Sequence, residues 1–140
     1  MNLYQKKREK KELEQQLLQK ESQKTEYRRK LECAEQIIQA NRRALMNIEY
    51  FQQDKMQVMR RFQGICSNQR SVKSMQYILE NRISGQSIRD LYGNVEGKIG
   101  CLVGMADSFE DQINHLNREI SRIEEKIEKL EREIRLQAEM

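Results

Sequence analysis

The chain has 140 residues, of which 34% are charged and 37% hydrophobic, and it contains no Pro and no Trp. An ordinary globular domain is about 25% charged and about 45–50% apolar, so these side chains cannot fill a compact core. Because Pro, the commonest helix breaker, is missing, the composition predicts an all-α fold of long paired helices. It excludes a β-sandwich, a doubly wound α/β enzyme and a disulfide-stapled domain.

The first expected element is a long basic helix within residues 1–66, running from about Leu3 to Phe62, with Gly64 just past its end. Residues 1–62 hold 15 Lys and Arg against 9 Asp and Glu, a net charge of +6. Polar side chains at Lys20, Lys24 and Asn41 interrupt its heptad repeat, and beyond Ile48 the phase slips toward Phe51, Met56, Val58 and Met59. The apolar residues that fit one heptad phase are Leu13, Leu17, Tyr27, Leu31, Ala34, Ile38, Leu45 and Ile48.

A short helical connector is expected over residues 67–86. Its apolar residues recur at helical spacing, Ser67 or Ser71 could cap it, and Ser84-Gly85 would end it. These apolar residues are Val72, Met75, Ile78, Leu79 and Ile83.

The last expected element, over residues 87–140, is a helix that is rich in Gly at first and then strictly heptad. Ser87 with Asp90 three residues later indicates the helix start. Residues 99–140 hold 6 Lys and Arg against 10 Asp and Glu, a net charge of −4. The seam, in which steps of three and four residues alternate, comprises Ile99, Leu102, Ala106, Phe109, Ile113, Leu116, Ile120, Ile123, Ile127, Leu130 and Ile134.

A basic first helix and an acidic last helix favour pairing within one chain. The sequence therefore predicts a single domain, a long two-helix antiparallel coiled-coil hairpin with a short helical connector. Each exposed ion pair contributes only about 0.2–1 kcal/mol, so the preference is modest. Ile at one seam position with Leu at the other favours parallel dimers, so a homodimer stays open.

No catalytic, metal or cofactor site is expected, and no small-molecule substrate. His115 is the sole His, and no nucleophile, P-loop or metal-ligand motif occurs. The basic residues of segment 6–11 are interleaved with Glu9, so nucleic-acid binding is not expected. No apolar run approaches the roughly 18 residues of a membrane span. Three widely spaced cysteines, Cys33, Cys66 and Cys101, indicate a reducing, cytoplasmic location.

Four glycines in the last element are spaced by four, three and four residues, which places them on one face of a helix. Gly costs about 1 kcal/mol relative to Ala inside a helix, so a run of them needs a reason. One hypothesis is a docking face for a partner helix, and the alternative is a flexible joint over residues 85–104. The candidate partner-binding residues are Tyr92, Gly93, Gly97, Gly100, Cys101, Gly104 and Met105.

Leu91-Tyr92-Gly93, followed by Ala106-Asp107-Ser108-Phe109 and the heptads that end at Ile127-Glu128-Lys129-Leu130, resembles the Trp-x-Gly turn and second helix of small helical proteins of bacterial type VII secretion. More narrowly, the chain resembles the coiled-coil proteins that accompany LXG-domain toxins. This resemblance implies a targeting or chaperone partner of a secreted toxin, in a hetero-oligomer and with co-export possible. Two alternatives stay open: a stalk or regulator of a flagellar or type III export ATPase, and a basic coiled coil that binds nucleic acid.

Overall fold

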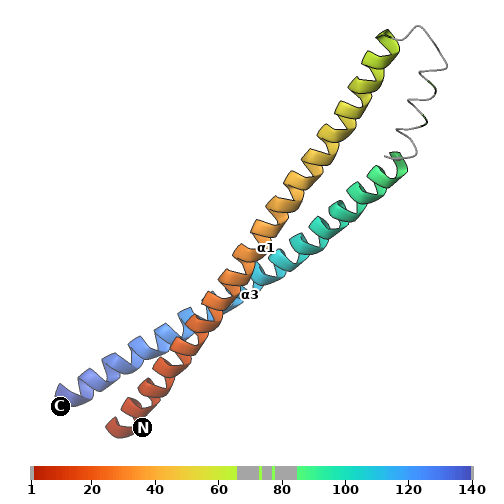
Figure 1. The fold of residues 1–140 in the computed structure, drawn as a ribbon. Coiled ribbons are helices and arrows are strands. Elements are labelled where there is room, and N and C mark those ends of the chain that lie inside the picture. The colour runs from red at the N-terminus through yellow and green to blue at the C-terminus, as the bar shows by residue number, and fades with distance from the viewer. Residues whose placement is uncertain (1, 66–72, 74–76, 78–84, 140) are drawn as a thin grey trace. The chain divides into compact units, whose positions relative to one another are not determined.

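A computed structural model describes residues 2–65, 73, 77 and 85–139. Within these residues the elements are helix α1, Leu3–Ile65, and helix α3, Gly85–Glu139, with no strand (Figure 1). The all-α prediction with two long helices is confirmed. The connector expected over residues 67–86 lies outside the described residues, apart from positions 73, 77, 85 and 86.

A reciprocal cap explains why α1 begins at Leu3. The backbone N–H of Gln5 donates to Asn2 Oδ1 (2.8 Å), and the N–H of Asn2 donates to Gln5 Oε1 (3.2 Å). This pairing satisfies two donors of the first turn, as in a capping box. At its other end α1 runs through Gly64 to Ile65. The expectation that Gly64 ends the helix in a left-handed conformation is wrong, because no described Gly has a positive φ.

Helix α3 begins at Gly85, two residues before the expected cap at Ser87. Side chains of its first turns also bond to one another: Gln86 Nε2 donates to Asp90 Oδ1 (2.9 Å), and Arg89 donates to Gln86 Oε1 (3.1 Å). The segment 85–104 is continuous helix, so the four glycines do not form a break in the backbone. The flexible-joint alternative therefore does not describe this segment.

The two helices divide between two compact units. Unit 1 comprises Met1–Ala34 and Gly104–Met140, and unit 2 comprises Glu35–Val103.

Unit 1 is an antiparallel helix pair with an apolar seam. Figure 1 shows its red and blue segments side by side, with both chain ends at the same end of the pair. Ion pairs join Lys6 to Glu133 (3.6 Å) and Lys10 to Glu131 (3.4 Å), so positions rise along α1 as they fall along α3. The rings of Tyr27 and Phe109 lie 6.3 Å apart at the other end. The buried apolar residues of unit 1 are Leu13, Ala34, Ala106, Ile113, Leu116, Ile120, Ile123, Ile127 and Leu130.

Unit 2 contains much less buried apolar surface. Among its described residues, the buried apolar side chains are Ile38 and Ile88. The seam residues Ile99 and Leu102 are half-buried, as are Phe109 and Ile134 at the two ends of the unit 1 seam. Large apolar side chains of unit 2 that are exposed are Ile37, Met46, Tyr50, Phe51, Met56, Val58, Tyr77 and Leu91. The heptad seam thus leaves unit 2 only partly covered.

Candidate interaction surfaces

The predicted glycine face is exposed on a regular helix. Gly93, Gly97 and Gly100 lie in unit 2, and Gly104 is the first α3 residue of unit 1. A Cβ added at any of these four glycines would meet no atom within 4 Å. The described residues therefore leave this face open, and docking of a partner helix on it stays a prediction.

Tyr92 is engaged inside unit 2, not on the glycine face. Its hydroxyl donates to Glu49 Oε1 (3.1 Å), which ties α3 to α1. This hydrogen bond, followed by the negative charge of Glu49, raises the pKa of the Tyr92 phenol because both favour its neutral form. Tyr92 is half-buried and acts as a contact between the helices of unit 2.

The two remaining candidates, Cys101 and Met105, are both exposed on α3. Cys101 is a free thiol in unit 2, and Met105 in unit 1 is 51% exposed. The segment Leu91-Tyr92-Gly93, which stands for the Trp-x-Gly turn in the resemblance, lies inside α3 and not in a turn. This placement differs from the position that the resemblance implies.

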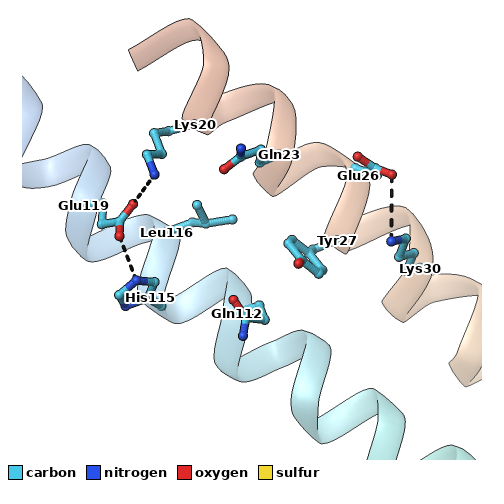
Figure 2. Close-up of a pocket in the computed structure, with 9 residues that line it drawn as sticks. All are labelled: Lys20, Gln23, Glu26, Tyr27, Lys30, Gln112, His115, Leu116 and Glu119. Atoms are coloured by element: carbon cyan, nitrogen blue, oxygen red, sulfur yellow. Dashed lines mark ion pairs between the residues drawn. The ribbon is translucent and has the colours of Figure 1, made fainter. Parts of the chain in front are cut away.

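Unit 1 contains a polar interruption of its seam (Figure 2). Lys20 Nζ lies 2.7 Å from Glu119 Oε2, and His115 Nε2 lies 2.7 Å from Glu119 Oε1. Glu119 Oε2 is buried and accepts no well-aligned hydrogen bond, so its contact with Lys20 is a close ion pair. Lys20 takes a seam position that an apolar residue would otherwise fill, and an open hollow of about 390 Å³ lies beside it.

The charges around this hollow are paired, which limits what it can do chemically. Besides the contacts of Glu119, Lys30 Nζ lies 3.8 Å from Glu26 Oε1 and 5.3 Å from the centre of the Tyr27 ring. No cation or carboxylate in this set stands alone as an acid, a base or a ligand. A paired polar residue inside a coiled-coil seam instead fixes which positions face each other, at a cost in stability. This is the role we assign to Lys20 and Glu119.

Glu119 makes the stability of unit 1 depend on pH. The ammonium of Lys20 lowers the pKa of this carboxyl most strongly, desolvation opposes it with the next largest effect, and His115 lowers the pKa further by a smaller amount. A lowered pKa in the folded state means that the stabilisation is complete above the unfolded pKa of about 4.3 and is lost as the pH falls through the folded pKa. We expect the wild type to melt above Glu119→Gln at pH 7 and the difference to shrink below about pH 4.5.

Circular dichroism melts between neutral and acidic pH measure this difference. Glu124→Gln is the matched control, since Glu124 is exposed on the same helix and its difference from the wild type should not depend on the Lys20 contact. A difference in melting temperature between the wild type and Glu119→Gln that stays constant with pH would show that the contact with Lys20 does not stabilise the Glu119 carboxylate.

A surface that the sequence analysis missed lies on α1 in unit 2. Ile37, Ala44, Phe51 and Val58 are spaced by seven residues and form one line, here called the outer stripe. The three large members are 44–47% exposed, and Ala44 is half-buried. The signal was present in the sequence as the apparent slip of phase at Phe51 and Val58. The seam itself continues past them at half-buried positions, so the outer stripe is a second apolar line beside it.

Comparison with known proteins adds no identification. The chain matches no protein family, no curated protein and no solved structure. Among the described residues, no group of three or more His, Cys, Asp or Glu side chains could hold a metal ion. In the same residues no helix is both long and apolar enough to cross a membrane.

Proposed function

We propose that this chain is a non-catalytic interaction module that binds a helical protein partner. The observation that carries the proposal is the contrast between the two units. Unit 1 buries the α3 seam residues from Ile113 to Leu130, whereas unit 2 leaves large apolar side chains such as Phe51, Val58 and Leu91 about half exposed. Exposed apolar residues that gather on one part of a surface are typical of an interaction site.

The partner we propose is the helical N-terminal domain of a toxin exported by a bacterial type VII system. This finer assignment depends on the sequence resemblance around Leu91-Tyr92-Gly93 and on the succession of long helices. A helical partner suits a helical surface, because apolar residues at heptad spacing on one helix pack between those of another. The partner would cover apolar residues that the helix pair of unit 2 leaves exposed.

Co-expression with the helical domain of an LXG-type toxin tests the proposal. We expect the two chains to co-elute with a defined ratio of masses by light scattering. Backbone amides of unit 2 should exchange with solvent more slowly in the complex, because partly covered helices open more readily than buried ones. Amides around the buried seam of unit 1 serve as the internal reference, and they should change little.

An unrelated coiled coil of the same net charge as the toxin domain is the matched control. Binding of both chains to the same extent would show non-specific association and contradict the proposal. A chain that stays separate from the toxin domain would contradict the type VII assignment.

A further inference from the structure

The outer stripe lies on the flank of unit 2 that the Tyr92–Glu49 hydrogen bond leaves open. Successive helical residues are about 100° apart, so Phe51 points about 200° away from Glu49 around α1. On α3, Tyr92 takes a half-buried seam position, and Leu91, the residue before it, is exposed on the side of this seam that faces away from Glu49. Because the hydroxyl of Tyr92 meets Glu49 on one flank, Phe51 and Leu91 belong to the opposite flank.

The charges along this flank are predominantly positive. Arg43 precedes the stripe residue Phe51 by eight positions and Arg61 follows it by ten, so both lie about 80° from Phe51 on the same side of α1. Lys98 follows Leu91 by seven residues on α3 and is exposed, like both arginines. None of these three cations forms an ion pair with another residue in the described part of the chain.

Two exposed carboxylates, Asp54 on α1 and Asp90 directly before Leu91 on α3, lie among these three cations, so the flank keeps an excess of one positive charge. Opposite charges beside an apolar seam set which helix pairs with which. We propose that this flank binds an amphipathic helix of another protein, with an apolar heptad stripe laid on Phe51 and Val58 and with Glu or Asp along its edges. The inference rests on the proposed function and names the face and the chemistry of the partner.

A synthetic peptide tests the proposal with the full chain. The probe has about four heptads with Leu at the first and fourth positions and Glu at the positions on either side of this seam. Its matched control has Lys in place of every Glu; in both peptides like charges oppose self-association. We expect the Glu peptide to bind at least about tenfold more tightly than the Lys peptide, as measured by fluorescence anisotropy.

Two neighbouring pairs of arginines provide matched variants. Arg43→Gln with Arg61→Gln removes two charges from the flank. Arg42→Gln with Arg60→Gln removes the same charge from the opposite side of α1, since Arg42 and Arg60 each lie nine residues, or two and a half turns, from Phe51. We expect the first pair to weaken binding of the Glu peptide about fivefold and the second to leave it unchanged.

The apolar part of the proposal has its own matched pair. Phe51→Ser should weaken binding of the Glu peptide at least about tenfold, whereas Met46→Ser should not. Met46 is 50% exposed and lies nine residues from Ile37, on the other side of α1. Both sites are exposed, so neither variant should alter the helix content, which circular dichroism checks.

Equal binding of the Glu and Lys peptides, or equal effects of the two members of either variant pair, would overturn the inference. Self-association of the chain that Phe51→Ser abolishes would also overturn it, since a second copy would then be the occupant. If the toxin domain still bound the Phe51→Ser variant at full strength, the proposed function would stand and only the assignment of binding to this flank would be overturned. If the wild-type chain bound the Glu peptide but not the toxin domain, the type VII partner would be overturned and the assignment of binding to this flank would stand.

Discussion

The Ile127→Asp variant is expected to lose at least about 3–5 kcal/mol of the free energy of unfolding. Ile127 is 9% exposed and packs in a buried cluster with Leu13, Ile123 and Leu130. Removing a buried Ile side chain costs about 2–5 kcal/mol, and an unpaired carboxylate in an apolar seam adds a further desolvation cost. Since a domain of this kind is stable by only about 5–15 kcal/mol, this loss is a large share of the stability of unit 1, and its unfolding midpoint in urea should fall clearly. Urea titrations followed by circular dichroism measure the loss.

Leu18→Asp is the matched control for this variant. Leu18 is 67% exposed and lies on α1, so the same carboxylate should change the free energy of unfolding by less than about 0.5 kcal/mol. Ile120→Asp, at another buried seam position, should behave like Ile127→Asp. If the Leu18 and Ile127 variants lost equal stability, the seam would not be the core of unit 1.

The helices and the seam of unit 1 could be predicted because their signal is local and periodic. Steps of three and four residues from Phe109 to Leu130 keep one face of a helix toward a neighbour for as long as they continue. The opposite charges of the first and last segments then favour antiparallel pairing, and the ion pair between Lys10 and Glu131 is a contact of that kind. The fold class therefore required no knowledge of long-range packing.

The helix ends were harder to predict because they depend on which local bonds compete. Gly64 can end a helix, yet it continues one here, since no described Gly takes up the left-handed conformation. Ser87 was expected to cap the last helix, yet α3 already includes Gly85, and in its first turns Gln86 donates to Asp90 while Arg89 donates to Gln86. Helix ends commonly shift by one or two residues in this way.

The candidate surfaces were predicted only in part, because the heptad pattern does not determine how far each side chain is buried. The sequence placed the glycines on one face of a helix, and α3 shows that face open. It did not distinguish a slip of the heptad phase from a second apolar line, since Phe51 and Val58 fit either interpretation until the exposure of each position is known. Tyr92 was assigned to a docking face, whereas its hydroxyl bonds to Glu49 within unit 2.

The Gly97→Ala, Gly100→Ala variant is expected to gain about 2 kcal/mol of free energy of unfolding. Each Gly costs about 1 kcal/mol relative to Ala inside a helix, because it gives up more backbone freedom on folding. The added methyl groups would meet nothing within 4 Å among the described atoms, so no steric cost offsets this gain. Thermal and urea unfolding of the chain without a partner measure this change in the free energy of unfolding. Destabilisation by the two Ala residues would mean that other atoms already lie against these positions.

The same two glycines separate stability from partner binding when the side chain is enlarged. Gly97→Leu with Gly100→Leu should keep the helix content of the chain, because both positions are exposed and a Cβ added at either meets no described atom within 4 Å. If a partner backbone approaches this face closely, the Leu pair should abolish its binding, while the Ala pair, with a much smaller side chain, weakens it far less. Equal binding by the wild type and the Leu pair would show that the partner does not use the glycine face. The outer stripe, which includes Phe51, would then be the remaining candidate for the binding surface. Comparing partner binding by Phe51→Ser and by Met46→Ser in the same assay tests this.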